Sequence, residues 1–444
     1  MTLGAVLEPG LVVSLLATGV LLNRRRAPIP RRPNPDEEDP SPPGTPGSDA
    51  PLLDSLPWGK DEAPSTASIS RTEIANKRRE GWRPRTLKAG PWRRTVWTPD
   101  TAVYKNRWFS RVVAQFPFLV EALYWALLYW VYQLGRAFTA VTLLQSTVSV
   151  ARRHALQVIR TERALHIFWE LDIQAWFLAR PSLLKIINNI YSFVHIPGTI
   201  AFLVWLYWYT DAAPHLRTRS RNSKPGERSS PARSPTRALA DQAIYHARRR
   251  TMAMCNLLAF VVFTLWPCMP PRLLSDSTLK DADTPAGLSG QGFGFVDTVH
   301  GKGSVASVWT QNKFCNQYAA MPSLHFGYSL LIGASIATVP VRGAAGAPEW
   351  VFSLHGVQYR LRVPGWNWRR LGCVGVGVLY PLTILVAIVA TANHFLLDAV
   401  AGAGVCGLAW WGNEGMVNLR PVEDWALWCV GLHFPEGEDE REEV

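Results

Sequence analysis

The chain has 444 residues, of which 48% are apolar and 20 are Trp, and its formal net charge is +12. The apolar residues come in long blocks separated by basic segments, which is typical of a polytopic membrane protein and argues against a nucleic-acid-binding one. The six cysteines form no Cys-x-x-Cys pair and have no His at zinc spacing, so we expect no metal site, and we expect no cofactor.

The N-terminal apolar stretch, residues 3–22, is followed by three arginines. A secretory signal would carry its positive charges before the apolar region, so we expect a membrane anchor over residues 1–26 with the arginines in the cytosol. The segment that follows is rich in Pro, Ser, Asp, Glu and Arg and is too polar to bury a core. We therefore expect residues 27–110 to be a disordered cytosolic tail.

The remaining apolar blocks lie within residues 111–412, which we expect to form one transmembrane domain. The expected spans are residues 116–144, 186–210, 252–267, 322–339, 371–392 and 394–411. Between the first two, residues 162–178 alternate apolar and charged side chains at helical spacing, which predicts a helix lying in the membrane surface. The expected fold class is all-α, with a six-span helical core plus the N-terminal anchor.

The basic loops indicate the orientation. Residues 211–250 hold nine arginines and few acidic residues, and residues 342–370 are also basic, so both loops are expected in the cytosol. The segment around residues 268–320 then lies on the opposite side of the membrane. Cys268 and Cys315 flank this segment, and both a disulfide between them and two buried free thiols stay open. Residues 413–444 are expected to form an interfacial segment and an acidic C-terminal tail.

Two polar motifs each open an expected span: Ser323 with His325, and His394 with Asp398. An ionisable side chain at the edge of a span costs free energy unless it is used or paired. His394 and Asp398 are four residues apart, so on a helix the carboxylate can accept from the imidazole. Two imidazoles and a carboxylate suit phosphoester chemistry: one imidazole attacks phosphorus, Asp398 fixes its tautomer, and the other protonates the leaving oxygen.

A phosphate would need donors beside these groups. Pro322 at a first helical position, with Ser323 next to it, would leave backbone N–H groups free for a phosphate. Arg272 and Lys313 are the nearest basic residues on the same side and are expected to complete the site.

Further candidates lie in the span over residues 186–210, where Tyr191 and His195 are one turn apart on one face. An intramembrane His is a site hypothesis, and a histidine bonded to a neighbouring helix is its alternative. The same alternative holds for the two motifs, whose histidines would then be structural residues at span ends with Asp398 as a helix cap. Gly402 and Gly404 are expected as close helix-packing positions rather than ligand contacts.

Four sequence blocks, in order, resemble the type-2 phosphatidic acid phosphatase superfamily, and within it the inositolphosphotransferase branch that includes inositol phosphorylceramide synthase. The blocks are Asn-Ile-Tyr with a following His-Ile-Pro at 189–197, Pro-Pro-Arg-Leu-Leu at 270–274, Asn-Gln-Tyr-Ala-Ala-Met-Pro-Ser-Leu-His at 316–325, and Asn-His-Phe-Leu-Leu-Asp-Ala-Val-Ala-Gly at 393–402. The likeness covers about residues 160–412 and implies a six-span phosphatidic acid phosphatase-like catalytic core.

The resemblance implies a role for each residue. His394 would be the nucleophile that forms a phosphohistidine, Asp398 would orient it, and His325 would be the general acid, without a metal. Candidate substrate-binding residues are Ser323, Arg272, Lys313, Tyr318, His195 and Tyr191. Two departures concern the phosphate-binding cation: the superfamily's Ser-Arg pair before the nucleophilic His is Ala387 and Ile388 here, and its Lys before Arg-Pro has only Pro271-Arg272 as a substitute.

The resemblance also implies a substrate class and a location. The donor would be phosphatidylinositol and the acceptor ceramide or another lipid alcohol, at the lumenal face of the Golgi or the endoplasmic reticulum. A regulatory subunit is a further candidate partner, and nucleic acid is not. Two other hypotheses stay open: hydrolysis of a lipid phosphate, and a non-catalytic multi-pass membrane protein that keeps the fold.

Overall fold

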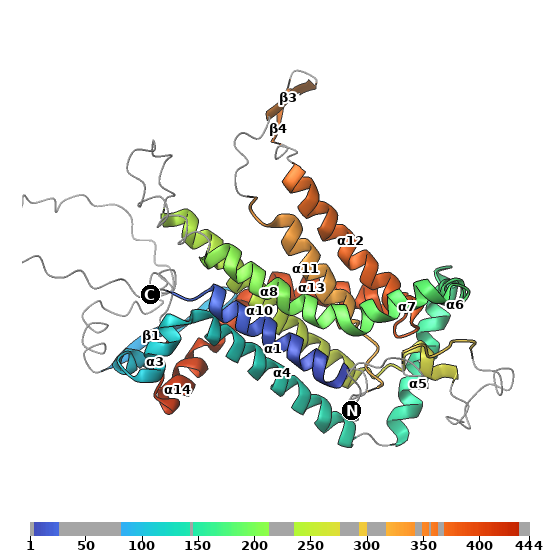
Figure 1. Ribbon diagram of the computed structural model, residues 1–444, viewed down its shortest axis with the longest axis horizontal. Coiled ribbons are helices and arrows are strands. Elements are labelled where there is room, and N and C mark those ends of the chain that lie inside the picture. Colours follow the sequence, from blue (N-terminus) through green and yellow to red (C-terminus); the bar gives the residue numbers. More distant parts are fainter. Residues whose placement is uncertain are drawn as a thin grey trace, which may run out of the picture. The chain divides into compact units, whose positions relative to one another are not determined.

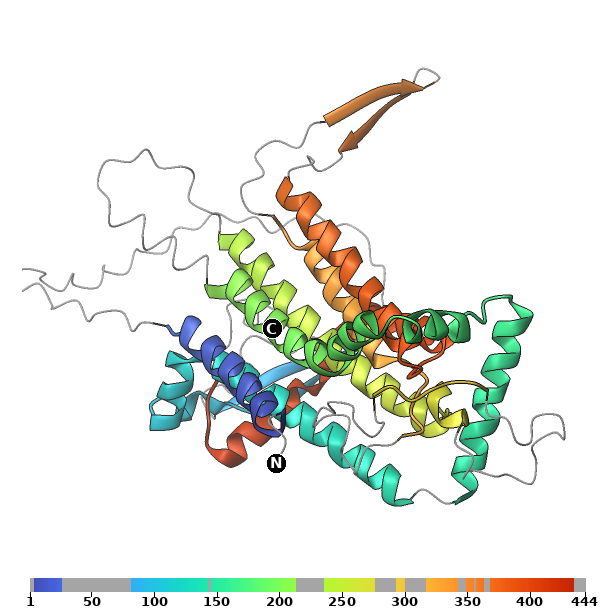
Figure 2. The same ribbon diagram turned by 45° about the vertical axis from the view of Figure 1, so that its right-hand side comes forward.

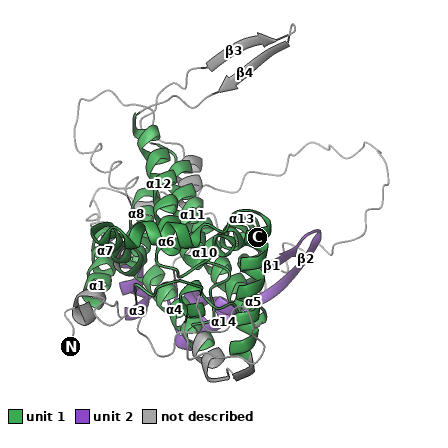
Figure 3. Ribbon diagram, turned by 90° about the vertical axis from the view of Figure 1, so that its right-hand side faces the viewer, with its two compact units in different colours: residues 1–23, 116–418 green, residues 24–115, 419–444 purple. Residues whose placement is uncertain are grey.

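The computed structural model describes residues 4–25, 81–142, 145–212, 235–275, 293–299, 317–341, 349–354, 357–362 and 368–434. The chain divides into two compact units (Figure 3). Unit 1 comprises residues 1–23 and 116–418, and unit 2 comprises residues 24–115 and 419–444. Several sequence predictions fall outside the described residues: most of the expected disordered tail, the middle of the first basic loop, the acidic C-terminus, Lys313 and Cys315.

Unit 1 is built almost entirely of helices (Figures 1 and 2). In chain order they are α1 (Gly4–Leu22), α4 (Pro117–Thr142), α5 (Gln145–Ala164), α6 (Glu170–Leu178), α7 (Pro181–Asn189), η2 (Ile190–Val194), α8 (His195–Tyr207), η3 (Trp208–Ala212), α10 (Pro235–Leu265), η4 (Pro271–Ser275), α11 (Leu324–Thr338), α12 (Trp368–Ala390), α13 (Leu396–Gly412) and η5 (Asn413–Leu419). Every apolar block predicted as a span contains one of these helices.

Membrane-crossing length is a stricter criterion than helicity. In the described part of the chain, α12 is the one helix that is by itself long and apolar enough to cross a membrane. Two bent pairs pass the same test together, Trp108–Gln115 with Pro117–Gly135 and Pro181–Ser192 with His195–Thr210. Pro9–Leu22 and Leu324–Thr338 are shorter apolar helices. The mainly helical prediction is therefore confirmed, whereas the count of six spans stays a prediction.

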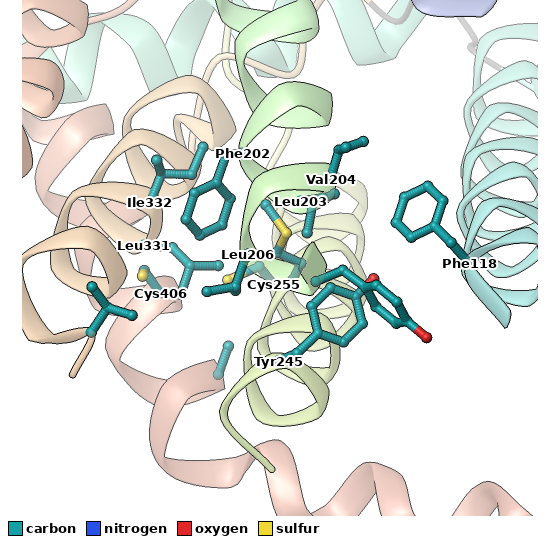
Figure 4. Close-up of a cluster of buried hydrophobic side chains, with 14 residues drawn as sticks. Phe118, Phe202, Leu203, Val204, Leu206, Tyr245, Cys255, Leu331, Ile332 and Cys406 are labelled. Carbon is teal, nitrogen blue, oxygen red and sulfur yellow. The ribbon is translucent and has the colours of Figure 1, made fainter. Parts of the chain in front are cut away.

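The core of unit 1 lies where α8, α10, α11 and α13 meet, with Phe118 of α4 at its margin (Figure 4). Leu206 of α8 and Leu331 of α11 are fully buried in it. Lipid tails are as apolar as these side chains, so close packing rather than exclusion of water holds such helices together in a membrane. Small residues favour that packing: on α11 and α12, a side chain at Gly333 or Gly377 would collide with the backbone of the other helix.

Two β-hairpins correct the all-α prediction. In unit 1, β3 (Glu349–Leu354) pairs antiparallel with β4 (Val357–Arg362) inside the second basic loop. In unit 2, β1 (Trp82–Ala89) pairs antiparallel with β2 (Trp92–Pro99), in a segment expected to be disordered. The rest of unit 2 contains η1 (Thr101–Tyr104), α3 (Trp108–Gln115) and α14 (Arg420–Val430).

Contacts between residues far apart in sequence explain why part of the expected tail is folded. Asp424 of α14 is buried and forms ion pairs with Arg83 and Arg85 of β1, with 2.8 Å between its Oδ2 and Nε of Arg85. The hydroxyl of Thr98 donates to the same oxygen at 2.7 Å. Burial alone would raise the pKa of Asp424, but the hydrogen bonds from Arg85 and Thr98 and the charges of both arginines hold it below its ordinary value.

Candidate functional site

The two histidine motifs meet where α11 and α13 begin. His325 lies in the first turn of α11, His394 lies in the turn between α12 and α13, and their ring centroids are 5.7 Å apart. The Ser323 backbone N–H donates to the carbonyl oxygen of Asp398 at 2.9 Å. Gly402 permits this approach, because a Cβ there would collide with the carbonyl of Ser323. The predicted juxtaposition of the two imidazoles is thus present in the structure.

The protonation of the His394 ring follows from its hydrogen bond. Nδ1 of His394 lies 2.8 Å from the carbonyl oxygen of Ala320. A carbonyl oxygen only accepts, so Nδ1 carries a proton, and in the neutral ring the lone pair is then on Nε2. Sequence reasoning gave this role to Asp398, but its Oδ2 is 3.6 Å from Nδ1 and accepts the Phe395 backbone N–H at 2.9 Å. Asp398 therefore caps α13 and places a negative charge beside the imidazole.

A second group of rings surrounds His325. The ring of Tyr191 stacks on it with centroids 4.8 Å apart, and the ring of His195 lies 5.1 Å away. Nδ1 of His195 is 3.2 Å from the hydroxyl of Tyr380 on α12. The structure brings both predicted residues, Tyr191 and His195, to His325. The structure also places Tyr380 in this group, a residue that the sequence analysis did not single out. Its hydroxyl inside an apolar block is the sequence feature that could have indicated it.

Arg272 lies against the residue that precedes the nucleophile candidate. Its Nε donates to Oδ1 of Asn393 at 2.9 Å, and its backbone N–H donates to the carbonyl oxygen of Ala392 at 2.9 Å. Nη1 of Arg272 is 3.9 Å from Oδ2 of Asp297. Ala392 has a φ of 51°, a left-handed conformation that is uncommon for a residue other than Gly and often occurs at functional sites. Arg272 is thus fixed to the turn that carries His394.

A family model with the description PAP2 superfamily matches residues 156–219, 236–357 and 351–412, which together are more than half of the chain. The chain belongs to the PAP2 superfamily. Members of this superfamily are generally phosphatases or phosphotransferases, so the chain is an enzyme of that broad type, compatible with a membrane location. No curated protein and no solved structure matches it.

Two positions of this PAP2 chain differ from the family motifs: Ala387 and Ile388 replace the Ser-Arg pair, and Pro271-Arg272 replaces the segment with a Lys before Arg-Pro. Ala387 and Ile388 are fully buried on α12, and the carbonyl oxygen of Ile388 accepts the backbone N–H groups of Asn393 and His394 at 3.1 and 3.2 Å. Ile388 therefore serves as packing and as a backbone acceptor at the position where the family motif has Arg. Arg272 of η4 is the arginine that the described part of the structure shows hydrogen-bonded to Asn393, beside His394.

Ser323 and Tyr318, both predicted to bind substrate, lie in the segment just before His325. α11 begins at Leu324, so Pro322 precedes the cap instead of filling the first helical position. Ser323 is fully buried, and its hydroxyl accepts the Phe326 backbone N–H at 3.4 Å. Tyr318 packs in a cluster that includes Cys268, a free thiol, and its carbonyl oxygen accepts the Cys268 backbone N–H at 2.8 Å. These contacts hold the segment that precedes His325, and the substrate-binding role of both residues stays a prediction.

The predicted surface helix over residues 162–178 is broken. α5 ends at Ala164 and α6 begins at Glu170, with His166 between them in a left-handed conformation of φ 58°. The break turns Glu162 and Glu170 inward, where both are fully buried against the start of α13. Sequence reasoning missed these two residues, because acidic side chains at helical spacing are typical of the solvated face of a surface helix. Among the described residues, no group of three or more His, Cys, Asp or Glu could hold a metal ion.

Proposed function

We propose that this PAP2-superfamily chain is a membrane phosphotransferase that moves a phospho-headgroup between lipids through a phosphohistidine at His394. The observation that carries the proposal is the hydrogen bond from Nδ1 of His394 to the Ala320 carbonyl, because in the neutral ring it directs the lone pair to Nε2, the atom proposed to attack phosphorus. His325, with its ring centroid 5.7 Å away, is near enough for both imidazoles to reach one phosphate group.

The proposed reaction has two balanced steps. In the first, Nε2 of His394 attacks phosphorus, the bond from phosphorus to the leaving lipid oxygen breaks, and His325 donates a proton to that oxygen. In the second, His325 takes the proton of the acceptor alcohol, whose oxygen attacks phosphorus while the phosphorus–nitrogen bond breaks. The negative charge of Asp398 stabilises the imidazolium that the first step creates, and Arg272 supplies the cation for the phosphate oxygens.

The donor and acceptor are proposed from the four sequence blocks. Their likeness to inositol phosphorylceramide synthases supports phosphatidylinositol as the donor and ceramide, or another lipid alcohol, as the acceptor. The phosphorus–oxygen bond to diacylglycerol would then break, leaving phosphoinositol on His394. Water in place of the alcohol would make the same site a lipid phosphatase, which is the second candidate function. A regulatory subunit is a further proposed partner.

The proposed site faces the lumen of an endomembrane. α11 runs from the site towards the second basic loop, and α12 returns from that loop to the site. With 15 and 23 residues, these helices are about 22 and 35 Å long at a rise of 1.5 Å per residue. α10 likewise connects the first basic loop to the segment before Arg272. Both basic loops therefore join helix ends distant from the site, which supports opposite sides of the membrane.

The test is lipid transfer by the purified chain given phosphatidylinositol with a labelled inositol headgroup, together with ceramide. Label in a ceramide-containing lipid supports transfer, whereas label in a water-soluble product supports hydrolysis. If folded wild-type protein forms neither labelled product, that result favours the non-catalytic alternative. We expect His394→Ala to lower turnover by about three orders of magnitude or more, because the nucleophile is lost. His166→Asn, at an exposed histidine, is the matched control and should keep wild-type turnover.

A further inference from the structure

The first turn of α13 is bound by carboxyl groups from three elements. The three backbone N–H groups that follow His394 each donate to a different side chain. Phe395 donates to Oδ2 of Asp398 at 2.9 Å, Leu396 to Oε1 of Glu170 at 2.9 Å, and Leu397 to Oε1 of Glu162 at 2.8 Å. These N–H groups are therefore occupied, so a phosphate must bind at other donors.

The Oε2 atoms of Glu162 and Glu170 bear on whether both carboxyl groups are ionised. Both residues are fully buried, and each Oε2 lacks a conventional donor in the described part of the chain. Glu170 is also the neighbouring acid whose charge acts most strongly on Glu162, ahead of Asp398. An ionised carboxylate only accepts, so two ionised side chains would leave both of these buried oxygens without a donor, whereas a proton on one carboxyl group makes it a donor. That proton also removes one of two like charges that would otherwise lie side by side in a buried place.

We propose that Glu162 and Glu170 are positioning residues that share one proton and, through the Leu397 and Leu396 N–H groups, hold the start of α13 and with it His394. The inference rests on the proposed function, in which His394 is the nucleophile. Glu162 ends α5 and Glu170 opens α6, so two elements outside the histidine motifs fix the turn that carries the imidazole. Neither carboxyl group needs to touch the substrate.

The surroundings of Glu162 support its protonated form. The titratable groups that face it are Glu170 on α6, Asp398 on α13 and Cys268 before η4, and none of these three supplies a positive charge. Burial raises the pKa of Glu162; the hydrogen bond from the Leu397 N–H opposes this, and the charges of Glu170 and Asp398 add to it. The folded state then keeps a proton that the unfolded state releases, so stability falls as the pH rises above the ordinary range of a carboxyl group.

The experiment compares three variants of the full-length chain in detergent. Glu162→Gln can still accept the Leu397 N–H and donate to Glu170, but it cannot titrate. Glu162→Ala does neither, and Asp172→Asn changes an exposed acid of the same region as a control. The readouts are the apparent melting temperature as a function of pH, and kcat and KM for lipid phosphate turnover.

We expect the alkaline loss of melting temperature to be smaller in Glu162→Gln than in wild type, and unchanged in Asp172→Asn. Glu162→Ala should lower kcat about tenfold or more with little change in KM, because a buried N–H loses its acceptor, and Glu162→Gln should recover most of that loss. Parallel pH curves for wild type and Glu162→Gln, or equal losses in Glu162→Gln and Glu162→Ala, would overturn proton sharing.

Failure of the proposed function gives a different result. Folded wild-type protein would then turn over no lipid phosphate, while the melting curves of wild type and Glu162→Gln would still differ in their pH dependence. If Glu162→Ala does not fold, the comparison of wild type with Glu162→Gln decides the inference by the melting curves alone.

Discussion

Arg272 is the residue on which phosphate binding depends in the proposed reaction. Its Nε is held by Asn393 at 2.9 Å, one position before His394, and the arginine of the family motif is replaced by the buried Ile388. A guanidinium presents several donors in a fixed plane and can bind two phosphate oxygens at once, whereas a lysine offers a single charged point.

We therefore expect Arg272→Gln to raise KM and to weaken inhibition by inorganic phosphate by about 10- to 100-fold, because a charge-assisted hydrogen bond is lost. Arg272→Lys should recover part of the binding, since the charge remains. Arg180→Gln, at an exposed arginine stacked on Trp176, is the matched control. Equal KM and phosphate inhibition in Arg272→Gln and wild type would assign the phosphate to another cation.

For single residues, the sequence is a more reliable guide to which side chains lie close together than to the hydrogen bonds and the role of each one. His325 and His394 are predictable because each opens an apolar block and the orientation puts both at one side of the membrane. The Ala320 carbonyl as the partner of Nδ1 is not predictable, because a backbone acceptor leaves no trace in residue type. Glu162 and Glu170 are likewise hidden, because their partners lie more than 200 residues further along the chain.

Among the elements, the crossing of α11 and α13 determines the distance between the histidines. At Gly402 the backbone of α13 passes so close to the Ser323 carbonyl that a Cβ would collide with it. Gly404, two residues further along the same helix, has open space around it. The sequence prediction grouped both glycines as packing positions, and the structure separates them by the face of the helix on which each lies.

This contrast gives a matched pair of variants. Gly402→Val should force α11 and α13 apart, cost about 1–3 kcal/mol of stability, and lower turnover about 100-fold by moving His325 away from His394. Gly404→Val adds the same side chain at an exposed position and should change neither stability nor turnover by a comparable amount. The apparent melting temperature and the turnover number measure the two effects. Equal behaviour of the two variants would contradict the close crossing.

Helix boundaries show a similar limit of sequence reasoning. The starts of α4 and α13 are predicted within two residues, because apolar runs begin there. The single surface helix over residues 162–178 is wrong, because His166 adopts a left-handed conformation that its residue type does not require. The β1–β2 hairpin is missed for another reason: Arg83 and Arg85 are typical of a solvated tail until Asp424, far along the chain, comes to pair with them.

In the whole molecule, the orientation in the membrane is the property that decides which lipids reach the site. Each basic loop joins helix ends that lie a full helix length from the histidines. We therefore expect both loops on one side of the membrane and the histidines on the other. A cysteine at position 225, in the first basic loop, should therefore be reached by reagents from the cytosol. One at position 316, nine residues before His325, should not.

The measurement uses sealed membrane vesicles with the cytosolic face outward and a membrane-impermeant maleimide. Cys315, Cys373 and Cys429 are first replaced by Ser, because the first is next to the probe position and the others are at least partly exposed. Pro225→Cys should then react in intact vesicles, and Asn316→Cys should react only after detergent opens them. Detergent also controls for the reactivity of each thiol. The reverse pattern would place the histidines on the cytosolic face and exclude a lumenal phosphotransferase, while leaving the pairing of His325 with His394 intact.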